Sequence, residues 1–233
     1  MKILSNREIA KNTFEMKLEC SDDFKPGQFI NIKIEGFYLR RPISVCDFNQ
    51  KELTIIYKIV GEGTKVMSKL EKGISLDVLA PLGNGYDTSI ITKEPILVGG
   101  GAGVPPMFGL AKALKAEGKN PTVILGFNSK DEVFYEKEFK DLGVELVICT
   151  LDGSYGAKGL VTDMFEESDY SCGCGPEPML KAIADKSDKG QYSFEARMAC
   201  GFGGCMGCSC ETKYGSKRIC KDGPVLNQEE IIW

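Results

Sequence analysis

The sequence predicts a multidomain protein of the β plus α/β class, with an antiparallel β-barrel, a parallel-sheet α/β domain and a small C-terminal domain. Three observations predict this architecture: short alternating strands in residues 1–92, strand–glycine–helix units in residues 93–190, and five of the ten cysteines in residues 191–233. A chain of 233 residues is also long enough to bury a sizeable core.

Alternating apolar stretches predict the barrel. QFINIKI (28–34), ELTIIYKIV (52–60) and ISLDVLA (74–80) are separated by segments that contain glycine, proline or asparagine. Short strands with turn residues between them are typical of a small antiparallel barrel.

Two segments of the barrel carry candidate binding residues. In FYLRRPISVCDF (37–48), we expect Arg41 to bind phosphate and Ser44 to bond to a ring nitrogen, since guanidinium groups suit phosphates and hydroxyls both donate and accept. The neighbouring Arg40 is expected to be a solvated or structural cation. GEGT (61–64) is consistent with a second phosphate contact or with a hairpin loop.

A glycine loop opens the second part. EPILVGGGAGVPPMFGLAKAL (94–114) predicts a buried strand, a loop and a helix, with Pro105 and Pro106 suited to the helix start. Glycines admit close backbone approach, and free N–H groups at a helix start attract phosphate. The loop is therefore a candidate dinucleotide site, although Pro106 replaces the last glycine of G-x-G-x-x-G and an ordinary strand–helix turn is the alternative.

Further units repeat this pattern. PTVILGF (121–127) and VELVICT (144–150) are expected strands separated by a helix, and YSCGCGPEPMLKAIADK (170–186) is another strand, glycine turn and helix. The alternation predicts a parallel sheet that binds its ligand at the carboxyl ends of the strands. The residues expected to bind the dinucleotide there are Gly100, Gly101, Gly103, Gly175 and Pro176, with Cys174 as a candidate catalytic residue beside a nicotinamide.

The cysteines of the tail have a specific spacing. Cys200, Cys205 and Cys208 follow C-x4-C-x2-C, and Cys220 comes eleven residues later, which matches plant-type 2Fe-2S proteins. A zinc site is the alternative, but it usually shows two C-x2-C pairs. Cys210 could exchange with Cys208 as a ligand, because residues two apart on a strand point the same way.

Composition excludes several classes of function. The chain has 29 basic and 33 acidic residues without a basic stripe, so nucleic acid and membrane surfaces are not expected partners. No histidine is present, which excludes Ser-His and Cys-His nucleophiles and a Rieske centre. The N-terminal segment MKILSNREIA has no apolar core of a signal peptide, so a cytoplasmic location is expected.

In this order, the three segments resemble the ferredoxin reductase superfamily, where a flavin-binding barrel precedes a nicotinamide-binding α/β domain. Within it, the chain resembles the electron transfer subunits of the NAD-linked (class 1B) dihydroorotate dehydrogenases. The motifs that carry this resemblance are RRPIS, YKIVGEGT, PLGNGY, GGGAGVPP, DGSYG, CGPEPML and MACGFGGCMGCSC with CKDGPV. The resemblance covers nearly the whole chain.

The resemblance implies FAD, a 2Fe-2S cluster and NAD as cofactors. It assigns FAD contacts to Arg41, Pro42, Ile43, Ser44, Ile56, Tyr57, Lys58, Gly63 and Thr64. It assigns the cluster to Cys200, Cys205, Cys208 and Cys220, and so leaves Cys210 free. Ile43 stands where the superfamily usually has tyrosine, and Lys58 where arginine is frequent, which keeps the charge without the bidentate fork.

The resemblance also implies a partner: an FMN-containing catalytic subunit that oxidises dihydroorotate in pyrimidine biosynthesis, in a heterotetramer with two copies of each subunit. Phe202 and Met206 are expected either to dock this partner or to shield the cluster from water. GFNSKDE (126–132) holds no arginine for a 2′-phosphate, so NAD is favoured over NADP, although Lys130 could serve.

Two rival functions remain open. One is the flavin and iron–sulfur NAD(P)H reductase subunit of a ferredoxin:NADP oxidoreductase or a sulfide dehydrogenase, which would share the cofactors and differ in partner. The other is a zinc or redox-sensing module that binds a nucleotide without catalysis. The colour of the purified protein distinguishes these possibilities: a protein with flavin and an iron–sulfur cluster is yellow-brown, whereas a zinc module is colourless.

Overall fold

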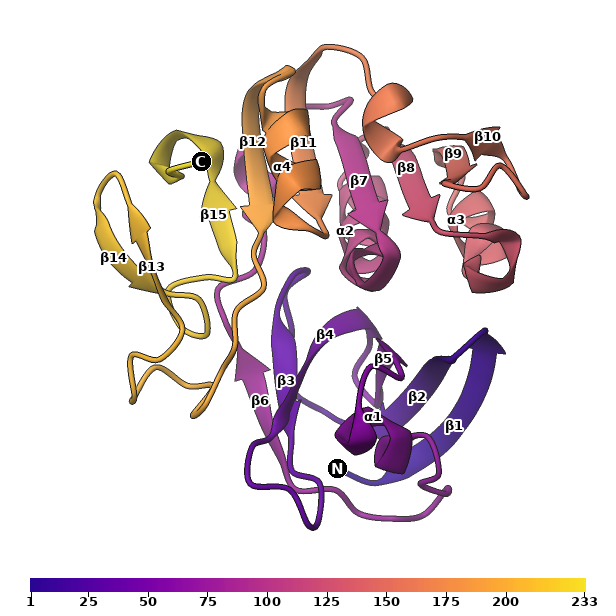
Figure 1. Ribbon diagram of the computed structural model, residues 1–233, viewed down its shortest axis with the longest axis vertical. Helices are drawn as coiled ribbons and strands as arrows, with labels where there is room; N and C mark the ends of the chain where they lie inside the picture. Colours follow the sequence, from indigo (N-terminus) through magenta and orange to yellow (C-terminus); the bar gives the residue numbers. More distant parts are fainter.

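In the computed structural model, which describes residues 1–233, the antiparallel barrel lies below the α/β domain and the C-terminal segment lies alongside (Figure 1). The fold class predicted from the sequence is confirmed: an antiparallel six-stranded sheet, a largely parallel seven-stranded sheet and a small two-stranded sheet. No helix combines the length and the apolar character that a membrane crossing needs.

The barrel strands have the spatial order β1-β2-β5-β4-β3-β6. A bridge between Lys2 and Ser75 and backbone hydrogen bonds from Ile3 to the segment at 73–74 close the sheet on itself. Along β3, Ile30 and Ile32 point into the barrel core. The strands are β1 (Ile3–Ala10), β2 (Thr13–Glu19), β3 (Phe29–Ile32), β4 (Arg41–Phe48), β5 (Glu52–Lys58) and β6 (Val78–Leu82).

Two expectations for the barrel need correction. The strand expected over 74–80 begins only at Val78, since residues 73–76 instead close the barrel against the start of β1. GEGT is not a hairpin loop but the start of helix α1 (Glu62–Met67). The Thr64 hydroxyl accepts hydrogen bonds from the N–H groups of Val60 and Gly61, which caps the helix start.

The large sheet has the order β10-β9-β8-β7-β11-β12-β15, with all neighbours parallel except β15. Helices α2 and α3 pack on one face and α4 on the other, so both faces are buried. The strands are β7 (Ile96–Gly100), β8 (Thr122–Phe127), β9 (Glu145–Thr150), β10 (Ala157–Lys158), β11 (Ser168–Cys174), β12 (Ser187–Ser193) and β15 (Val225–Asn227); the helices are α2 (Val104–Ala116), α3 (Glu136–Asp141) and α4 (Glu177–Ala184).

The start of α2 agrees with the sequence-based expectation. The glycine loop forms a 3₁₀ turn, η2 (Gly101–Gly103), and α2 begins at Val104 with both prolines in its first turn, where no N–H partner is needed. The other 3₁₀ turns are η1 (Thr88–Ile90), η3 (Lys130–Glu132), η4 (Val161–Asp163) and η5 (Gln228–Glu230).

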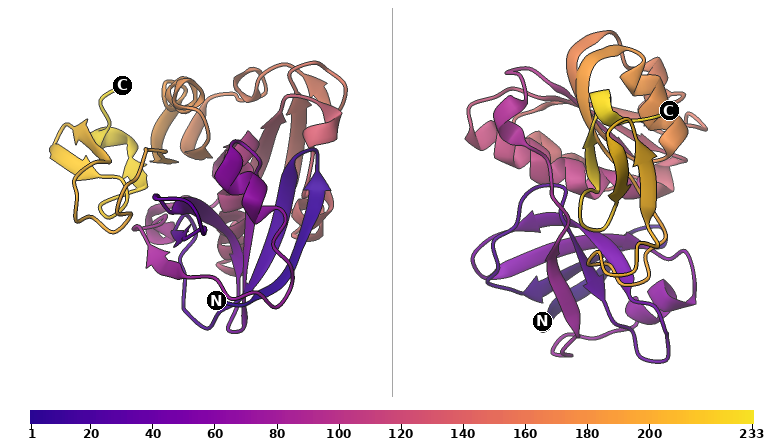
Figure 2. Two further views of the ribbon diagram at one scale, coloured as in Figure 1. Left: turned by 60° about the horizontal axis from the view of Figure 1, so that its bottom comes forward. Right: turned by 90° about the vertical axis from the view of Figure 1, so that its left-hand side faces the viewer.

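The C-terminal segment is tied into the α/β sheet. It leaves the sheet after β12, forms the hairpin of β13 (Ser209–Thr212) and β14 (Gly215–Arg218), and returns as β15. Ser193 pairs with Val225 across the β12–β15 ladder, and Figure 2 shows the yellow segment beside both larger domains. β12 thus continues across the domain boundary that the sequence predicted at 190.

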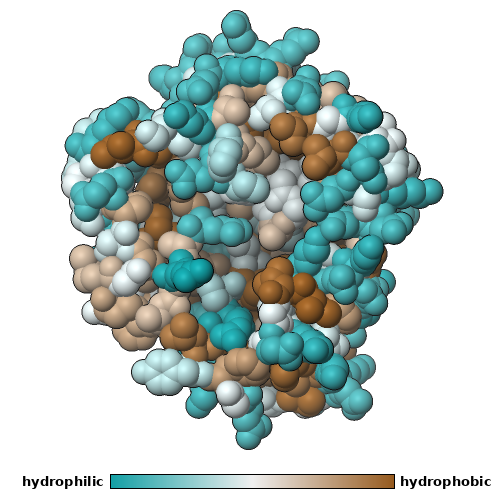
Figure 3. Space-filling model, viewed as in Figure 1, coloured by the Kyte–Doolittle hydropathy of each residue, from teal (hydrophilic) through white to brown (hydrophobic).

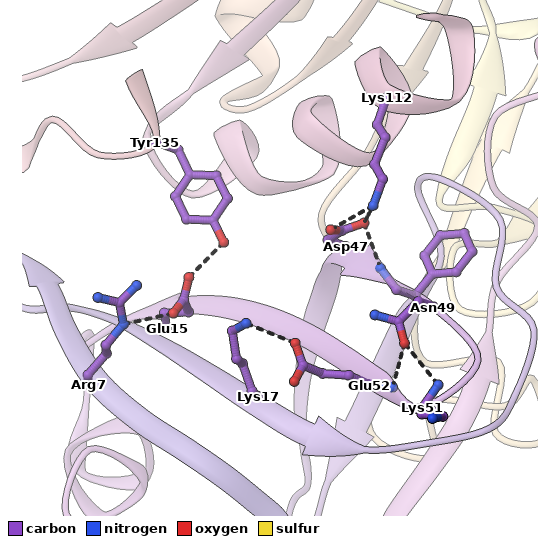
Figure 4. Close-up of polar contacts among 10 residues, drawn as sticks. Arg7, Glu15, Lys17, Asp47, Asn49, Lys51, Glu52, Lys112 and Tyr135 are labelled. Atoms are coloured by element: carbon purple, nitrogen blue, oxygen red, sulfur yellow. Dashed lines mark hydrogen bonds and ion pairs between the residues drawn. The ribbon is translucent and has the colours of Figure 1, made fainter. Parts of the chain in front are cut away.

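The barrel and the α/β domain share a close interface. Helix α2 lies so near to β4 that a Cβ atom at Gly109 would stand 2.7 Å from the carbonyl oxygen of Cys46. Tyr135 donates a 2.7 Å hydrogen bond to buried Glu15, and Lys112 pairs with Asp47 at 2.6 Å (Figure 4). These contacts fix how the two domains face each other.

Candidate cofactor-binding site

A cavity of about 280 Å³ lies where all three parts of the chain meet. β3, β4 and β5 line it from the barrel, Ala102 and Cys174 from the α/β domain, and residues 193–196, Met198 and Pro224 from the C-terminal segment. In Figure 3, apolar side chains lie around a hollow between the two larger domains. Seven of the nine expected FAD contacts line this cavity: Pro42, Ile43, Ser44, Ile56, Tyr57, Lys58 and Thr64.

Arg41 and Gly63, the other two expected FAD contacts, meet each other directly beside this cavity. A Cβ atom at position 63 would stand 2.3 Å from Arg41 Nε, so only glycine allows this approach. The Arg41 guanidinium lies 4.9 Å from the Phe37 ring centre and bonds to backbone carbonyls, but it pairs with no carboxylate. Arg40, in contrast, pairs with Asp77 at 2.9 Å, which confirms its structural role.

The residues expected on β5 play different roles in the structure. The Tyr57 side chain points into the barrel, where its hydroxyl donates to Asn6 at 2.9 Å, so it lines the cavity without presenting its hydroxyl there. The Lys58 ammonium pairs with Glu132 of the α/β domain at 2.7 Å. Burial raises the pKa of Glu132, but the hydrogen bonds from Lys58 and Asn128 outweigh it and lower that pKa overall.

A second cavity, of about 670 Å³, lies at the carboxyl ends of the parallel strands. Gly100, Gly101, Gly175 and Pro176 line it, as the sequence predicted, and Ala102 and Glu195 line both cavities. Gly103 does not line either one. Its role is close packing, because a Cβ atom there would stand 1.9 Å from the carbonyl oxygen of Cys174.

Cys174 lies at the junction of the two cavities, at the end of β11. Burial, and to a lesser degree the nearby charge of Glu195, raises the pKa of the Cys174 thiol to about 12. The side chain is therefore a neutral thiol at physiological pH, so it can contact a ring without acting as a nucleophile. Cys172, two residues earlier, is fully buried and packs in the core of the α/β domain.

The structure places thiols of the tail near one another. The Cys205 thiol is close enough to lower the pKa of Cys200, and, beyond the effect of burial, Cys208 and Cys200 both raise the pKa of Cys220. Burial raises the pKa of Cys200, but hydrogen bonds from the backbone of Phe202, the backbone and thiol of Cys205, and the backbone of Gly204 lower it to about 6.

The donor set bears on the kind of metal centre. No group of three acidic, cysteine or histidine side chains converges in the way that one metal ion would require. A structural zinc site usually shows two C-x2-C pairs, and here only Cys205 and Cys208 have that spacing. Four thiols with the spacing of Cys200, Cys205, Cys208 and Cys220 fit the donor set of a plant-type 2Fe-2S cluster better.

Backbone groups and one arginine hold the ligand loop. The N–H of Gly204 donates to Cys200 Sγ at 3.2 Å, and the N–H of Cys220 donates to Cys208 Sγ at 3.4 Å. Arg218 donates to the Gly203 carbonyl at 2.9 Å and pairs with both carboxylate oxygens of Asp222. The arginine therefore links the loop that carries Cys200 and Cys205 to the turn that carries Cys220.

Several residues of the site were missed by sequence reasoning. Phe29 lines the 280 Å³ cavity and belongs to the same apolar cluster as Cys208 and Cys220. Asn84 donates to the Val225 carbonyl at 2.7 Å and joins the barrel to the turn after Cys220. Glu195 faces both cavities. Nothing in the local sequence marks these residues, because their neighbours come from distant segments.

Comparisons with known proteins agree with this geometry. The family described as the iron-sulfur cluster binding domain of dihydroorotate dehydrogenase B matches residues 195–232. The chain is 47% identical to the electron transfer subunit of dihydroorotate dehydrogenase B (NAD(+)) of Bacillus pumilus, over 98% of this chain and 96% of that protein. It is 48% identical to the protein of the same name from Fusobacterium nucleatum, over 97% and 95% of the two chains.

Solved structures show the same fold. The NADH-dependent reduced ferredoxin-NADP oxidoreductase, studied for flavin-based electron bifurcation, matches with a TM-score of 0.88 and 31% identity, over 100% of this chain and 89% of that one. The Amycolatopsis cytochrome P450 reductase GcoB matches with a TM-score of 0.70 and 23% identity, over 79% of this chain and 65% of that one. The second likeness concerns the fold alone.

Proposed function

The chain belongs to the family of electron transfer subunits of NAD(+)-linked dihydroorotate dehydrogenase B, and we propose that it links a dihydroorotate-oxidising catalytic subunit to NAD+. Its cofactors are FAD, a 2Fe-2S cluster and NAD. A bound flavin exchanges two electrons with a nicotinamide and single electrons with a cluster, which explains why one chain combines the three.

The meeting of all three parts of the chain around one cavity is the observation that carries this proposal. The 280 Å³ cavity shares Ala102 and Glu195 with the cavity at the sheet, and its lining residue Phe29 belongs to the same apolar cluster as Cys208 and Cys220. A flavin in the smaller cavity would therefore be in reach of a nicotinamide on one side and of the thiols on the other.

The barrel residues would hold FAD by charge and shape. Arg41 has no carboxylate partner and so is free to bind the pyrophosphate, next to the helix start that Gly63 keeps open. Ser44 lies on the cavity wall within the flavin-binding motif, where its hydroxyl can donate or accept at the ring. The charge of Lys58 is already balanced by Glu132, so we assign Lys58 a weaker role in FAD binding than Arg41.

We propose that the ligands of the cluster are Cys200, Cys205, Cys208 and Cys220. Their spacing is that of plant-type 2Fe-2S ligands, and backbone N–H groups of Gly204 and Cys220 donate to the sulfurs of Cys200 and Cys208, whereas Cys210 lies on β13 opposite Lys217. The low pKa of Cys200 favours the thiolate form that iron binds.

The nicotinamide dinucleotide would lie along the carboxyl ends of β7, β8 and β11. The lining of this cavity includes Asn128 but no arginine or lysine, so a 2′-phosphate would find no cationic partner on its wall. This supports NAD over NADP. Cys174 and Glu195 would lie beside the nicotinamide ring.

We propose that the catalytic partner contains FMN, docks over the ligand loop, and forms a heterotetramer with two copies of each subunit. Phe202 is 58% exposed and Met206 is 54% exposed, so more than half of each side chain faces solvent rather than the thiols. Exposed apolar side chains beside a redox centre are suited to contact with a partner protein.

The test is anaerobic co-expression with the FMN-bearing dihydroorotate dehydrogenase subunit of the same cell, followed by an assay of dihydroorotate-dependent NAD+ reduction. We expect co-purification and NADH formation, lost in Cys205→Ser and retained in Cys210→Ser, which changes a cysteine outside the ligand set. A yellow-brown chain that oxidises NADH but neither binds this subunit nor responds to dihydroorotate would instead support the function of the oxidoreductase that it matches at 31% identity.

A further inference from the structure

The side-chain amide of Asn31 is buried without any hydrogen-bond partner in the chain. The residue is only 1% exposed, and its Oδ1 atom is the one fully buried side-chain polar atom that lacks a partner. Its Nδ2 atom makes no hydrogen bond within the chain either; Arg40 bonds only to the backbone carbonyl of Asn31 and not to its amide. A buried amide without partners destabilises the fold, so a purely structural role would favour an apolar residue here.

Strand β3 carries Asn31 to the side of the cofactors. Ile30 and Ile32 point into the barrel core, so the alternate residues Phe29 and Asn31 face outward. Phe29 lines the flavin cavity and belongs to the same apolar cluster as Cys208 and Cys220. Asn31 therefore lies on the face of the strand that looks toward the C-terminal segment.

The contact with the ligand loop is direct. Gly201, which follows the ligand Cys200, has a positive φ of 78°, and a Cβ atom there would stand 2.2 Å from Asn31 Nδ2. Only glycine allows the loop to approach the amide this closely. The donor end of the amide thus lies against the part of the loop that would wrap a cluster.

We propose that the Asn31 side chain is a hydrogen-bond donor to the 2Fe-2S cluster beside Cys200, and that it raises the reduction potential of the cluster. The inference rests on the proposed function. Reduction adds a negative charge, and a donor aimed at the cluster sulfurs stabilises the more negative state. A bound cluster and ordered water would also provide the Asn31 amide with hydrogen-bond partners that the chain itself does not provide.

The test compares Asn31→Leu and Asn31→Asp with wild type by anaerobic redox titration, monitored by electron paramagnetic resonance of the reduced cluster. Leucine has a similar shape without a donor, and aspartate replaces the donor with a negative charge. We expect the midpoint potential to fall in both, by about tenfold in the reduction equilibrium for the leucine variant, or about 59 mV for one electron, and further for the aspartate variant.

Asn6→Leu is the matched control. Asn6 is also an amide on a barrel strand, but it bonds to the carbonyls of Met67 and Leu70 and to Tyr57, far from the tail. We expect this control to lower the melting temperature of the cluster-free chain and leave the potential unchanged. Asn31→Leu should instead lower the midpoint potential and leave the melting temperature unchanged or raised.

The possible outcomes separate the inference from the proposed function. An unchanged cluster potential in Asn31→Leu, or a loss of FAD with an unchanged potential, would overturn the inference and leave the function standing. A lower melting temperature of cluster-free Asn31→Leu with no change of potential would show a structural role instead. Zinc in place of iron in the purified wild-type chain would overturn both.

Discussion

The guanidinium group of Arg41 lies directly against Gly63, with 2.3 Å between Arg41 Nε and the point where a Cβ atom of residue 63 would stand. The arginine comes from β4 and the glycine from the first turn of α1. Two segments that are both expected to bind phosphate therefore form one continuous surface. The aromatic ring of Phe37 supports the guanidinium from another side.

Gly63→Ala should weaken FAD binding, because the new methyl group would push the guanidinium out of place. Gly61→Ala is the control: its Cβ would meet nothing within 4 Å, and its φ of −176° is open to any residue. The measurement is the flavin absorbance retained after purification. Equal flavin content in the two variants would contradict this role of Gly63.

Arg41→Ala should reduce FAD affinity by roughly ten- to a hundredfold, since hydrogen bonds to charged groups contribute about 1.5–3 kcal/mol. Arg40→Ala should change it little, because Asp77 already pairs with Arg40. Titration calorimetry of the flavin-free chain with FAD gives both affinities. If the two variants lost affinity equally, Arg41 would have no special part in phosphate binding.

Tyr135→Phe should destabilise the chain by about 1–3 kcal/mol, because it removes the hydrogen bond to the buried carboxylate of Glu15. Burial raises the pKa of Tyr135, so the phenol remains a donor at all accessible pH values. Tyr155→Phe removes a similar bond, to Glu136, a carboxylate that is more exposed than Glu15, and should change stability little. Urea unfolding of both variants measures the difference; a loss no larger than that of Tyr155→Phe would mean that the Glu15 contact does not hold the domains together.

Arg218→Lys should weaken cluster binding by about 10- to 100-fold, a typical cost when a group that orients metal ligands is changed. Lysine keeps the charge but cannot reach the Gly203 carbonyl and both oxygens of Asp222 together. Arg197→Lys, at an exposed arginine without an ion pair, is the control. Decay of the cluster absorbance under a chelator should be accelerated only in Arg218→Lys.

The Arg218–Asp222 pair also predicts a pH dependence. Hydrogen bonds from Arg218 lower the pKa of Asp222 from 3.8 to about 2. Because the folded pKa is the lower one, this contribution to stability is complete above about pH 4 and is lost as the pH falls through 2. Acid unfolding of the cluster-free chain should show this loss between pH 4 and 2, and Asp222→Asn should lack it.

The parts of the molecule that follow local patterns could be predicted from the sequence. The glycine loop followed by Pro105 and Pro106 marks a strand and a helix start by rules that act within a few residues. The spacing of the cysteines likewise identifies a two-iron centre, since the ligand loop must wrap within a short segment.

Other features depend on contacts that no local pattern reveals. Helix α1 starts in GEGT, a segment with two glycines, and forms because Thr64 caps it and Met67 packs in the barrel core. Asn31 looks like any polar residue of a strand until Gly201, 170 positions later, is placed against it. The expected boundary at 190 falls within β12, whose ladder runs on to Ser193, because the partner strand β15 comes from a distant part of the chain.

The pairing of Ser193 with Val225 makes the cysteine-rich segment an insertion with adjoining ends. Residues 194–224 leave the sheet and re-enter it at neighbouring rungs, so a short turn could join β12 to β15 directly and yield a flavin reductase without a metal centre. Conversely, the same two rungs offer a grafting point at which a reductase that lacks such a segment could be given one. Residues 194–224 could therefore be exchanged as one continuous segment, and a reductase could gain or lose electron transfer to a partner protein by that single exchange.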